Sequence, residues 1–236
     1  MNYKEVIEGR FLERPNRFVA VVEINGQEEL CHVKNTGRCK ELLIRGATVY
    51  LSVSDQPQRK TKYDLIAVMK GERLINMDSQ APNAAVKKWL PQMFPDGIRF
   101  LSEVRFGNSR FDFYVETPAK KIFLEVKGVT LEEDGAVRFP DAPTERGIKH
   151  LEELEKCVRQ GYDAYLLFVI QMSGVRYFAP NDRTHRAFGD ALRRAARSGV
   201  KVLARDCSVW REGMSVGESV EVRLNETENK NDSSSN

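Results

Sequence analysis

A continuous apolar run, Ala164–Ile170, lies between two helical patterns in the second half of the chain. Runs of this kind are expected of strands that are buried on both faces of a sheet. The first helical pattern, Thr144–Gln160, has an apolar stripe and is followed by Gly161, and the second, Thr184–Arg197, also has a glycine shortly after it. Helices on either side of a buried strand predict an α/β domain.

The same domain is predicted to begin upstream, with a helix at 82–93. The remaining predicted strands are Arg99–Phe106, Ser109–Val115, Lys121–Lys127 and Val200–Arg205. The order helix, three strands, helix, strand, helix, strand predicts a mixed sheet, and we assign this domain to residues 81–224. The tail, 225–236, lacks apolar residues and is predicted to be disordered.

The first half has a different pattern, in which short strands are separated by turns. Asn25-Gly26 is a strong hairpin signal between Phe18–Ile24 and Glu29–Lys34. A polar turn and a short helix are predicted at Asn35–Ile44. Further strands are expected near Ala47–Ser54, Leu65–Met69 and Arg73–Asn76. Several short strands around one helix favour an oligonucleotide-binding (OB) type β-barrel over residues 1–80, although other small barrels have a similar pattern.

Charge and composition limit the classes of partner. The 236 residues include 37 basic and 34 acidic side chains, so a nucleic-acid partner would require the basic residues to be clustered. The four cysteines are scattered and lack metal-ligand spacing, which argues against a zinc site. No apolar leader and no apolar run of about 20 residues is present, so the sequence predicts a cytoplasmic protein without a membrane partner.

The most informative chemistry lies on the predicted hairpin formed by Ser109–Val115 and Lys121–Lys127. Alternate side chains of a strand share a face. The apolar residues therefore form two rows that we expect to face one core: Phe111, Phe113 and Val115 on the first strand, and Ile122, Leu124 and Val126 on the second.

The register that aligns these rows places Asp112 opposite Glu125 on the other face, with Lys127 one pleat beyond. Carboxylates this close repel each other unless a cation or a proton lies between them. Oxygen ligands of this kind suit Mg²⁺ or Mn²⁺, and Lys127 could stabilise charge on a phosphate. Alternating polar residues on a hairpin are more often a solvated face, and the hairpin alone favours that interpretation.

Further charged residues, most of them basic, are predicted to lie near this hairpin. Arg146, Lys149, His150 and Glu153 recur at helical spacing on the following helix, where they would lie beside the phosphate, although a solvated helix face is the commoner structure. Glu103 is a third candidate acid.

A second group of polar residues, most of them basic, lies in the first half of the chain, at the end of a predicted strand, where a barrel could bind phosphates. Its members are Lys34, Asn35, Arg38 and Lys40.

Asp112 followed by Glu125-Val126-Lys127 resembles the motif of the PD-(D/E)xK nuclease superfamily, with Phe111 in place of the proline. Longer blocks resemble the sugar fermentation stimulation protein family more specifically, and the resemblance covers nearly the whole chain except the tail. These blocks are CHVKNTGRCKELL at 31–43, NSRFDF at 108–113, LEVKGVTL at 124–131 and FPDAPTERGIKHLEEL at 139–154.

The resemblance implies an OB-type barrel joined to a restriction-endonuclease-like domain that binds DNA with little sequence specificity. It also implies a regulatory role linked to sugar metabolism. Carried over to this sequence, Asp112 and Glu125 take the metal-ligand role, and Lys127 takes the role of the catalytic lysine. Further candidates in the FPDA block are Thr144, Arg146, Lys149 and His150.

Two functions of different classes therefore remain open. One is an Mg²⁺-dependent nuclease, and the other is a non-catalytic DNA-binding regulator that uses the same fold as a clamp. The absence of a helix-turn-helix signature argues against sequence-specific recognition by a helix. The partner is expected to be DNA, or RNA, and a homodimer stays open.

Overall fold

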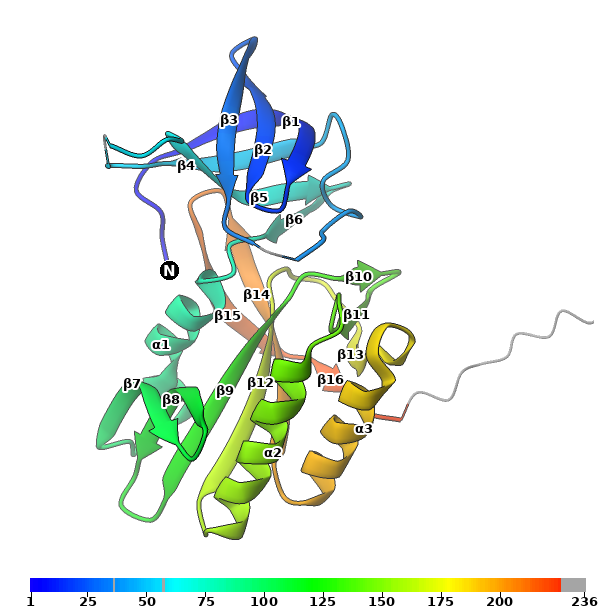
Figure 1. Ribbon diagram of the computed structural model, residues 1–236. Coiled ribbons are helices and arrows are strands. Elements are labelled where there is room, and N and C mark those ends of the chain that lie inside the picture. The colour runs from blue at the N-terminus through cyan, green and yellow to red at the C-terminus, as the bar shows by residue number, and fades with distance from the viewer. Residues whose placement is uncertain (36, 57, 226–236) are drawn as a thin grey trace, which may run out of the picture.

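A computed structural model describes residues 1–35, 37–56 and 58–225 of the chain (Figure 1). The first six strands form a sheet in the order β3-β2-β1-β4-β5-β6, and parallel pairing of β3 with β5 closes it into a barrel. The predicted OB-type fold of the N-terminal half is confirmed. The strands of this barrel are β1 (Val6–Asn16), β2 (Val19–Ile24), β3 (Gln27–Val33), β4 (Thr48–Val53), β5 (Tyr63–Lys70) and β6 (Arg73–Asn76).

The hairpin between β2 and β3 turns at Asn25 and Gly26, which both have positive φ (53° and 78°), as a two-residue hairpin loop requires. The prediction of a short helix within Asn35–Ile44 was wrong, because the described part of this segment contains turns and no helix. The guanidinium of Arg14 donates hydrogen bonds to the carbonyl oxygens of Asn35, Gly37 and Arg38. These carbonyl groups are therefore satisfied without helical hydrogen bonds.

The second domain is built on a six-stranded mixed sheet in the order β15-β14-β12-β9-β8-β7. The three central strands β14, β12 and β9 are parallel, and the outer pairings are antiparallel. This arrangement confirms the predicted restriction-endonuclease-like fold class. The strands are β7 (Arg99–Phe106), β8 (Ser109–Glu116), β9 (Lys121–Val129), β12 (Asp163–Ile170), β14 (Lys201–Trp210) and β15 (Gly213–Ser219).

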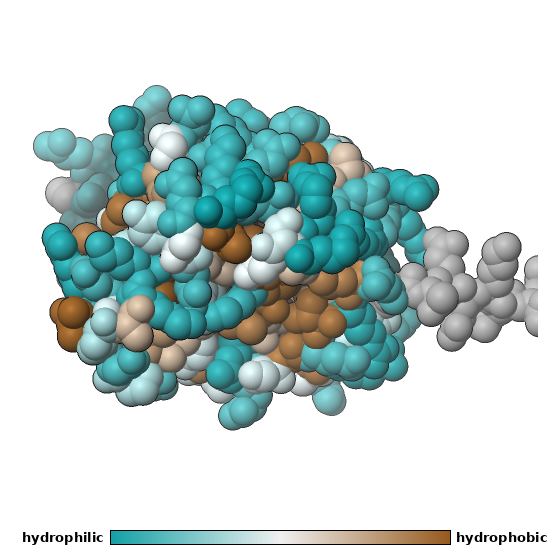
Figure 2. Space-filling view, turned by 90° about the horizontal axis from the view of Figure 1, so that it is seen from below, coloured by the Kyte–Doolittle hydropathy of each residue, from teal (hydrophilic) through white to brown (hydrophobic). Residues whose placement is uncertain are grey.

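Helices cover both faces of this sheet. Helix α1 (Ala81–Met93) packs on one face, and α2 (Glu145–Arg159) and α3 (Asp182–Arg197) lie side by side on the other (Figure 1). The run Ala164–Ile170 in β12 is buried between them except for Tyr165, as the apolar pattern predicts. Seen from the end opposite the barrel, the domain has a mostly hydrophilic surface with an apolar area among the polar side chains (Figure 2).

A small four-stranded sheet completes this domain beside the barrel, in the order β10-β11-β13-β16. The sequence patterns did not predict it, because its strands are only two or four residues long. They are β10 (Glu132–Glu133), β11 (Ala136–Phe139), β13 (Tyr177–Pro180) and β16 (Glu221–Val222).

Helix α2 begins where the sequence predicts it. The hydroxyl of Thr144 accepts a hydrogen bond from the backbone N–H of Gly147, which caps the helix, and Gly161 with a φ of 84° follows its end. Leu151 and Leu154 of the predicted stripe are fully buried. Among the described residues, no helix is both long and apolar enough to span a membrane. The predicted disordered tail lies outside the described residues from 226 onward.

Candidate functional site

The acidic pair lies on strands β8 and β9 in the register that the sequence predicts. Val115 pairs with Ile122, and Phe113 pairs with Leu124. Backbone pairing between β8 and β9 ends at Phe113 and Leu124. Beyond that pair, the side chain of Asp112 contacts β9 instead, because its Oδ2 accepts a hydrogen bond of 2.7 Å from Val126 N. The carboxylate of Asp112 therefore contacts the backbone of β9 directly beside Glu125.

The apolar row on β8 differs from the prediction at Phe111. Phe113 and Val115 pack in the cluster under α1, whereas Phe111 belongs to the cluster on the α2 face. The β7–β8 pairing is interrupted at this point, between the pairs Ser102–Phe113 and Val104–Phe111, and Glu103 in β7 has a φ of 59°. The prediction that both rows face one core was wrong at this position, and the ring of Phe111 packs edge-on against His150 instead.

Each carboxylate oxygen of Asp112 accepts a hydrogen bond. Its Oδ1 accepts a hydrogen bond of 2.7 Å from the amide of Asn83 in α1, and its Oδ2 is bound to Val126 N. Burial, and next the negative charge of Glu125, raise the pKa of Asp112 to about 6. Glu125 is therefore close enough for its charge to oppose the ionisation of Asp112.

Glu125 is 3% exposed and its two oxygens differ in their surroundings. Oε1 accepts hydrogen bonds from Lys127 Nζ at 2.6 Å and from His150 Nδ1. Oε2 is buried without a hydrogen-bond partner among the described residues. Burial acts to raise the pKa of Glu125, but the hydrogen bond from His150 and the charge of Lys127 outweigh it and hold that pKa below its usual range.

These side chains fit a divalent cation that keeps part of its water shell. Asp112 and Glu125 supply the carboxylates, and the partnerless Oε2 of Glu125 is the kind of buried lone pair that a cation would satisfy. Across the part of the chain that the structure describes, no group of three or more His, Cys, Asp or Glu side chains could hold a metal ion. Water, backbone or substrate oxygens would therefore complete the coordination, as is usual for Mg²⁺.

The other acidic and basic candidates of this domain have different positions. Glu103 is exposed and forms an ion pair of 2.8 Å with Arg110, so its carboxylate is engaged away from Glu125. Thr144 serves as the cap of α2. The predicted stripe on α2 divides, since His150 is buried at the site whereas Arg146 and Lys149 are exposed.

The basic group of the barrel also divides into engaged and exposed side chains. Lys34 forms a 2.8 Å ion pair with the buried carboxylate of Asp78, and the amide of Asn35 donates to the carbonyl oxygen of Met77. Both side chains therefore stabilise the junction between the domains. Arg38 and Lys40 are exposed on the loop that follows β3.

A cleft of about 200 Å³ lies between this loop and the end of β9. It is lined by Gly37 and Ser79 on the barrel side, by Asp141, and by Gly128 and Gln171 at the ends of the parallel strands. Sequence reasoning missed Gln171 and also Asn83. A polar residue directly after a buried parallel strand was a signal for Gln171, because ligands gather at the carboxyl ends of such strands. Asn83 carries no comparable signal, since its partner is 29 residues away.

The fold and the site together define a two-domain protein in which an OB-type barrel precedes a restriction-endonuclease-like domain with an acidic pair, of which Glu125 is buried and Asp112 half-buried. Comparison with family models gives the same division. The model described as "SfsA N-terminal OB domain" matches residues 12–77, and the model described as "Sugar fermentation stimulation protein RE domain" matches residues 80–213. The chain belongs to the sugar fermentation stimulation protein family.

Relatives cover almost the full length. A sugar fermentation stimulation protein homolog of Desulfitobacterium hafniense is 57% identical over 95% of this chain and 99% of its own. A homolog of Clostridium beijerinckii is 55% identical over 95% of this chain and 100% of its own. Among solved structures, SfsA of Pyrococcus furiosus in complex with Ca²⁺ is 27% identical with a TM-score of 0.85, over 94% of this chain and 98% of that one.

Proposed function

We propose that this protein is a divalent-cation-dependent nuclease that hydrolyses phosphodiester bonds of nucleic acid with little sequence specificity. The observation that carries the proposal is the acidic pair. Burial, and next the charge of Glu125, raise the pKa of Asp112, and Glu125 keeps a buried oxygen for which the described residues provide no donor. A cation between the two carboxylates would remove both costs.

The relative from Pyrococcus furiosus supports a divalent cation as a ligand of this fold. Its structure is a complex with Ca²⁺, and its fold matches this chain over nearly its whole length. Ca²⁺ and Mg²⁺ are both hard cations that prefer oxygen ligands, so two carboxylates suit either of them. Mg²⁺ or Mn²⁺ is the proposed cofactor of this chain.

The residues of the site have separate tasks under this proposal. Asp112 and Glu125 bind the cation, and Asn83 keeps the carboxylate of Asp112 in place through its 2.7 Å hydrogen bond. The ammonium group of Lys127 lies beside the pair and stabilises negative charge that develops on the phosphate in the transition state. The bound cation would polarise the phosphate and activate a water molecule.

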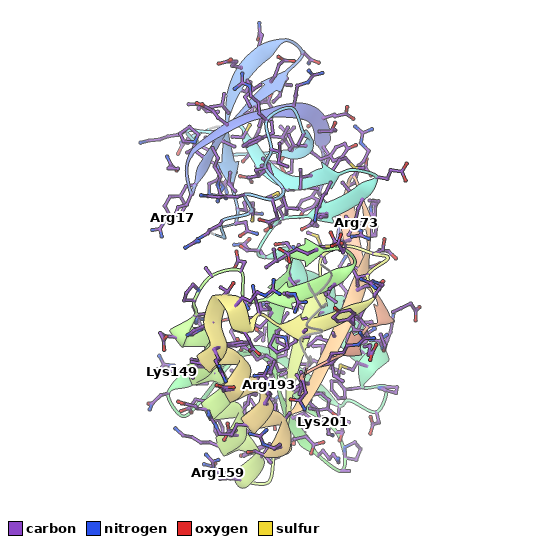
Figure 3. All side chains as sticks on the ribbon, turned by 90° about the vertical axis from the view of Figure 1, so that its right-hand side faces the viewer. Arg17, Arg73, Lys149, Arg159, Arg193 and Lys201 are labelled. Atoms are coloured by element: carbon purple, nitrogen blue, oxygen red, sulfur yellow. The ribbon has the colours of Figure 1, made fainter. Side chains whose placement is uncertain are left out.

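Exposed basic side chains support nucleic acid as the substrate. Arg38 and Lys40 lie on the barrel loop, and Arg146 and Lys149 lie on α2, with the interdomain cleft between the two groups. Figure 3 shows Arg17 of the barrel on the same side of the molecule as Lys149. Lys149 directly precedes His150, which is bound to Glu125, so phosphates bound at Lys149 would lie beside the helix that contacts the acidic pair. Phosphate contacts carry little sequence information, which agrees with low specificity.

The second candidate is a DNA-binding regulator that does not cleave. The exposed basic side chains favour it, because phosphate binding requires no chemistry and the two functions share the same surface. A regulatory role in sugar metabolism would be compatible with either candidate. The two differ only in whether Lys127 and the cation act on the bound phosphate.

One experiment separates these candidates. Purified protein is incubated with labelled single- and double-stranded DNA and RNA in Mg²⁺, Mn²⁺ or EDTA, beside Asp112→Asn and Lys127→Ala variants. A nuclease cleaves at least one substrate with Mg²⁺ or Mn²⁺ and none in EDTA, and both variants are inactive. Lys121→Ala, an exposed lysine at the start of β9 that belongs neither to the acidic pair nor to the proposed phosphate-binding side, is the matched control and should cleave. Binding without cleavage of any substrate would instead support the regulator.

A further inference from the structure

Oε1 of Glu125 accepts two hydrogen bonds, whereas Oε2 accepts none from the described residues. This difference requires a group that holds the carboxylate in one orientation. Turning the carboxylate out of this orientation would break the bonds that Oε1 accepts from Lys127 Nζ and from His150 Nδ1. Lys127 is a flexible side chain and is half-buried. The imidazole of His150 is 5% exposed and packs edge-on against the ring of Phe111, with 6.2 Å between the ring centroids. His150 is therefore the more rigid of the two donors.

Arg146 determines which nitrogen of His150 carries the proton. Its Nε lies 3.4 Å from His150 Nε2, one turn along α2. A guanidinium group can only donate, so Nε2 must accept. In a neutral imidazole the proton then lies on Nδ1, which donates it to Glu125 Oε1. Lys127 Nζ, 3.4 Å from Nδ1, is also a donor, so that contact reflects only their shared acceptor, Glu125.

This arrangement excludes one role for His150 and defines another. Its single lone pair in the neutral state faces Arg146, so it is not available to take a proton from an attacking water molecule. We propose that His150 is a positioning residue, which holds Glu125 Oε1 so that Oε2 remains free to bind a divalent cation. The inference rests on the proposed function, since it assigns a role within the same site.

Groups that orient a metal-binding carboxylate typically change metal affinity or activity by about 10–100-fold when they are removed. Calorimetric titration of the full chain with Ca²⁺ alone measures this effect without any activity. His150→Ala and His150→Gln should weaken Ca²⁺ binding by about tenfold or more. His150→Asn should bind close to the wild-type value, because its amide nitrogen lies near the position of Nδ1, whereas that of Gln reaches toward Nε2.

His32→Ala is the matched control, because His32 also pairs with a carboxylate, that of Asp64 at 3.0 Å, but in the barrel. It should leave Ca²⁺ affinity unchanged. If the wild type binds no Ca²⁺, Mg²⁺ or Mn²⁺, the proposed function itself fails. If the wild type binds Ca²⁺ and His150→Ala binds it equally well, only the positioning role is overturned.

A measurement on the wild type tests the tautomer even if a variant does not fold. Nitrogen-15 NMR of the imidazole in EDTA should show a neutral ring protonated on Nδ1 for His150. A neutral ring protonated on Nε2 would overturn the inference, because it could not donate to Glu125 from Nδ1. Unchanged Nδ1 protonation in Arg146→Ala would show that Arg146 is dispensable for the tautomer and would remove it from the proposed chain of contacts.

Discussion

Replacing Asp112 by Asn should make the cation-free protein more stable at neutral pH, which is unusual for a half-buried side chain with two hydrogen bonds. Burial and the charge of Glu125 raise the pKa of Asp112 from 3.8 to about 6. At about 1.4 kcal/mol per pH unit, the ionised carboxylate opposes folding by about 3 kcal/mol at pH 7. Asn keeps an acceptor for Val126 N, but its amide nitrogen replaces the oxygen that accepts from Asn83, so the amide of Asn83 must turn to accept, and both bonds lose their charge-assisted strength. The free energy of unfolding should therefore rise by about 1–2 kcal/mol, which corresponds to a Tm rise of about 2–8 °C.

The pH dependence has a definite sign. A carboxyl group with a raised pKa binds its proton more tightly in the folded state, so its contribution to stability is lost as the pH rises through about 6. The advantage of the Asn variant should therefore be full at pH 7 and should vanish near pH 4. Urea unfolding in EDTA at several pH values measures it.

Asp163→Asn is the matched control with the opposite sign. Partial burial acts to raise the pKa of Asp163, but hydrogen bonds from Lys201 and Lys120 outweigh it and lower that pKa. Loss of this charge should therefore reduce stability at pH 7. The reasoning about the acidic pair would be refuted if Asp112→Asn were also less stable than the wild type at pH 7 in EDTA, or if the difference did not shrink on acidification.

Two further predictions concern the domain junction and the nucleic-acid surface. Glu132 is 5% exposed and forms ion pairs with Lys70 at 2.7 Å and with Arg73 at 2.8 Å. Glu132→Gln should therefore lower the free energy of unfolding by about 2–3 kcal/mol, as measured by urea unfolding at pH 7. Burial opposes ionisation, but these partners lower the pKa of Glu132 to about 2, so this contribution is lost as the pH falls from about 4.5 toward 2. Arg38→Ala with Lys40→Ala should weaken duplex DNA binding and reduce the slope of log affinity against log salt by about 2 in a filter-binding assay, and an unchanged slope would exclude both from the interface.

The parts of the structure that the sequence predicted are those with a strong period or a strong local signal. The stripe at Leu151 and Leu154, the turn at Asn25-Gly26 and the continuous run at Ala164–Ile170 each follow from spacing alone. Strand β1 was missed because VIEGRFLERPN alternates apolar and charged residues irregularly and contains Pro15. Its structure depends on pairing with both β2 and β4, which no local pattern reveals.

The candidate site was predictable to the extent that it lies on one hairpin. The register of β8 and β9 follows from the two apolar rows, and it brings Asp112 beside Glu125. The roles of Asn83 and His150 could not be derived in the same way, because each reaches the hairpin from a helix whose packing is a tertiary feature. The side of Phe111 was missed for a similar reason, since its ring packs against His150 of α2, a contact that no local pattern reveals.

Two of the connections between the domains fix the barrel relative to the acidic pair. At the linker, the amide of Gln171, at the end of β12, donates to the carbonyl oxygens of Asn76 and Asp78. At the neighbouring hairpin, Glu132 is bound to Lys70 and Arg73 of the barrel. Rotating the domains would break buried hydrogen bonds at one of these places, at a cost of about 1–3 kcal/mol for each group left without a partner. Under the proposed function, the barrel therefore acts as a fixed guide: the loop that it presents determines which part of a bound nucleic acid reaches the site.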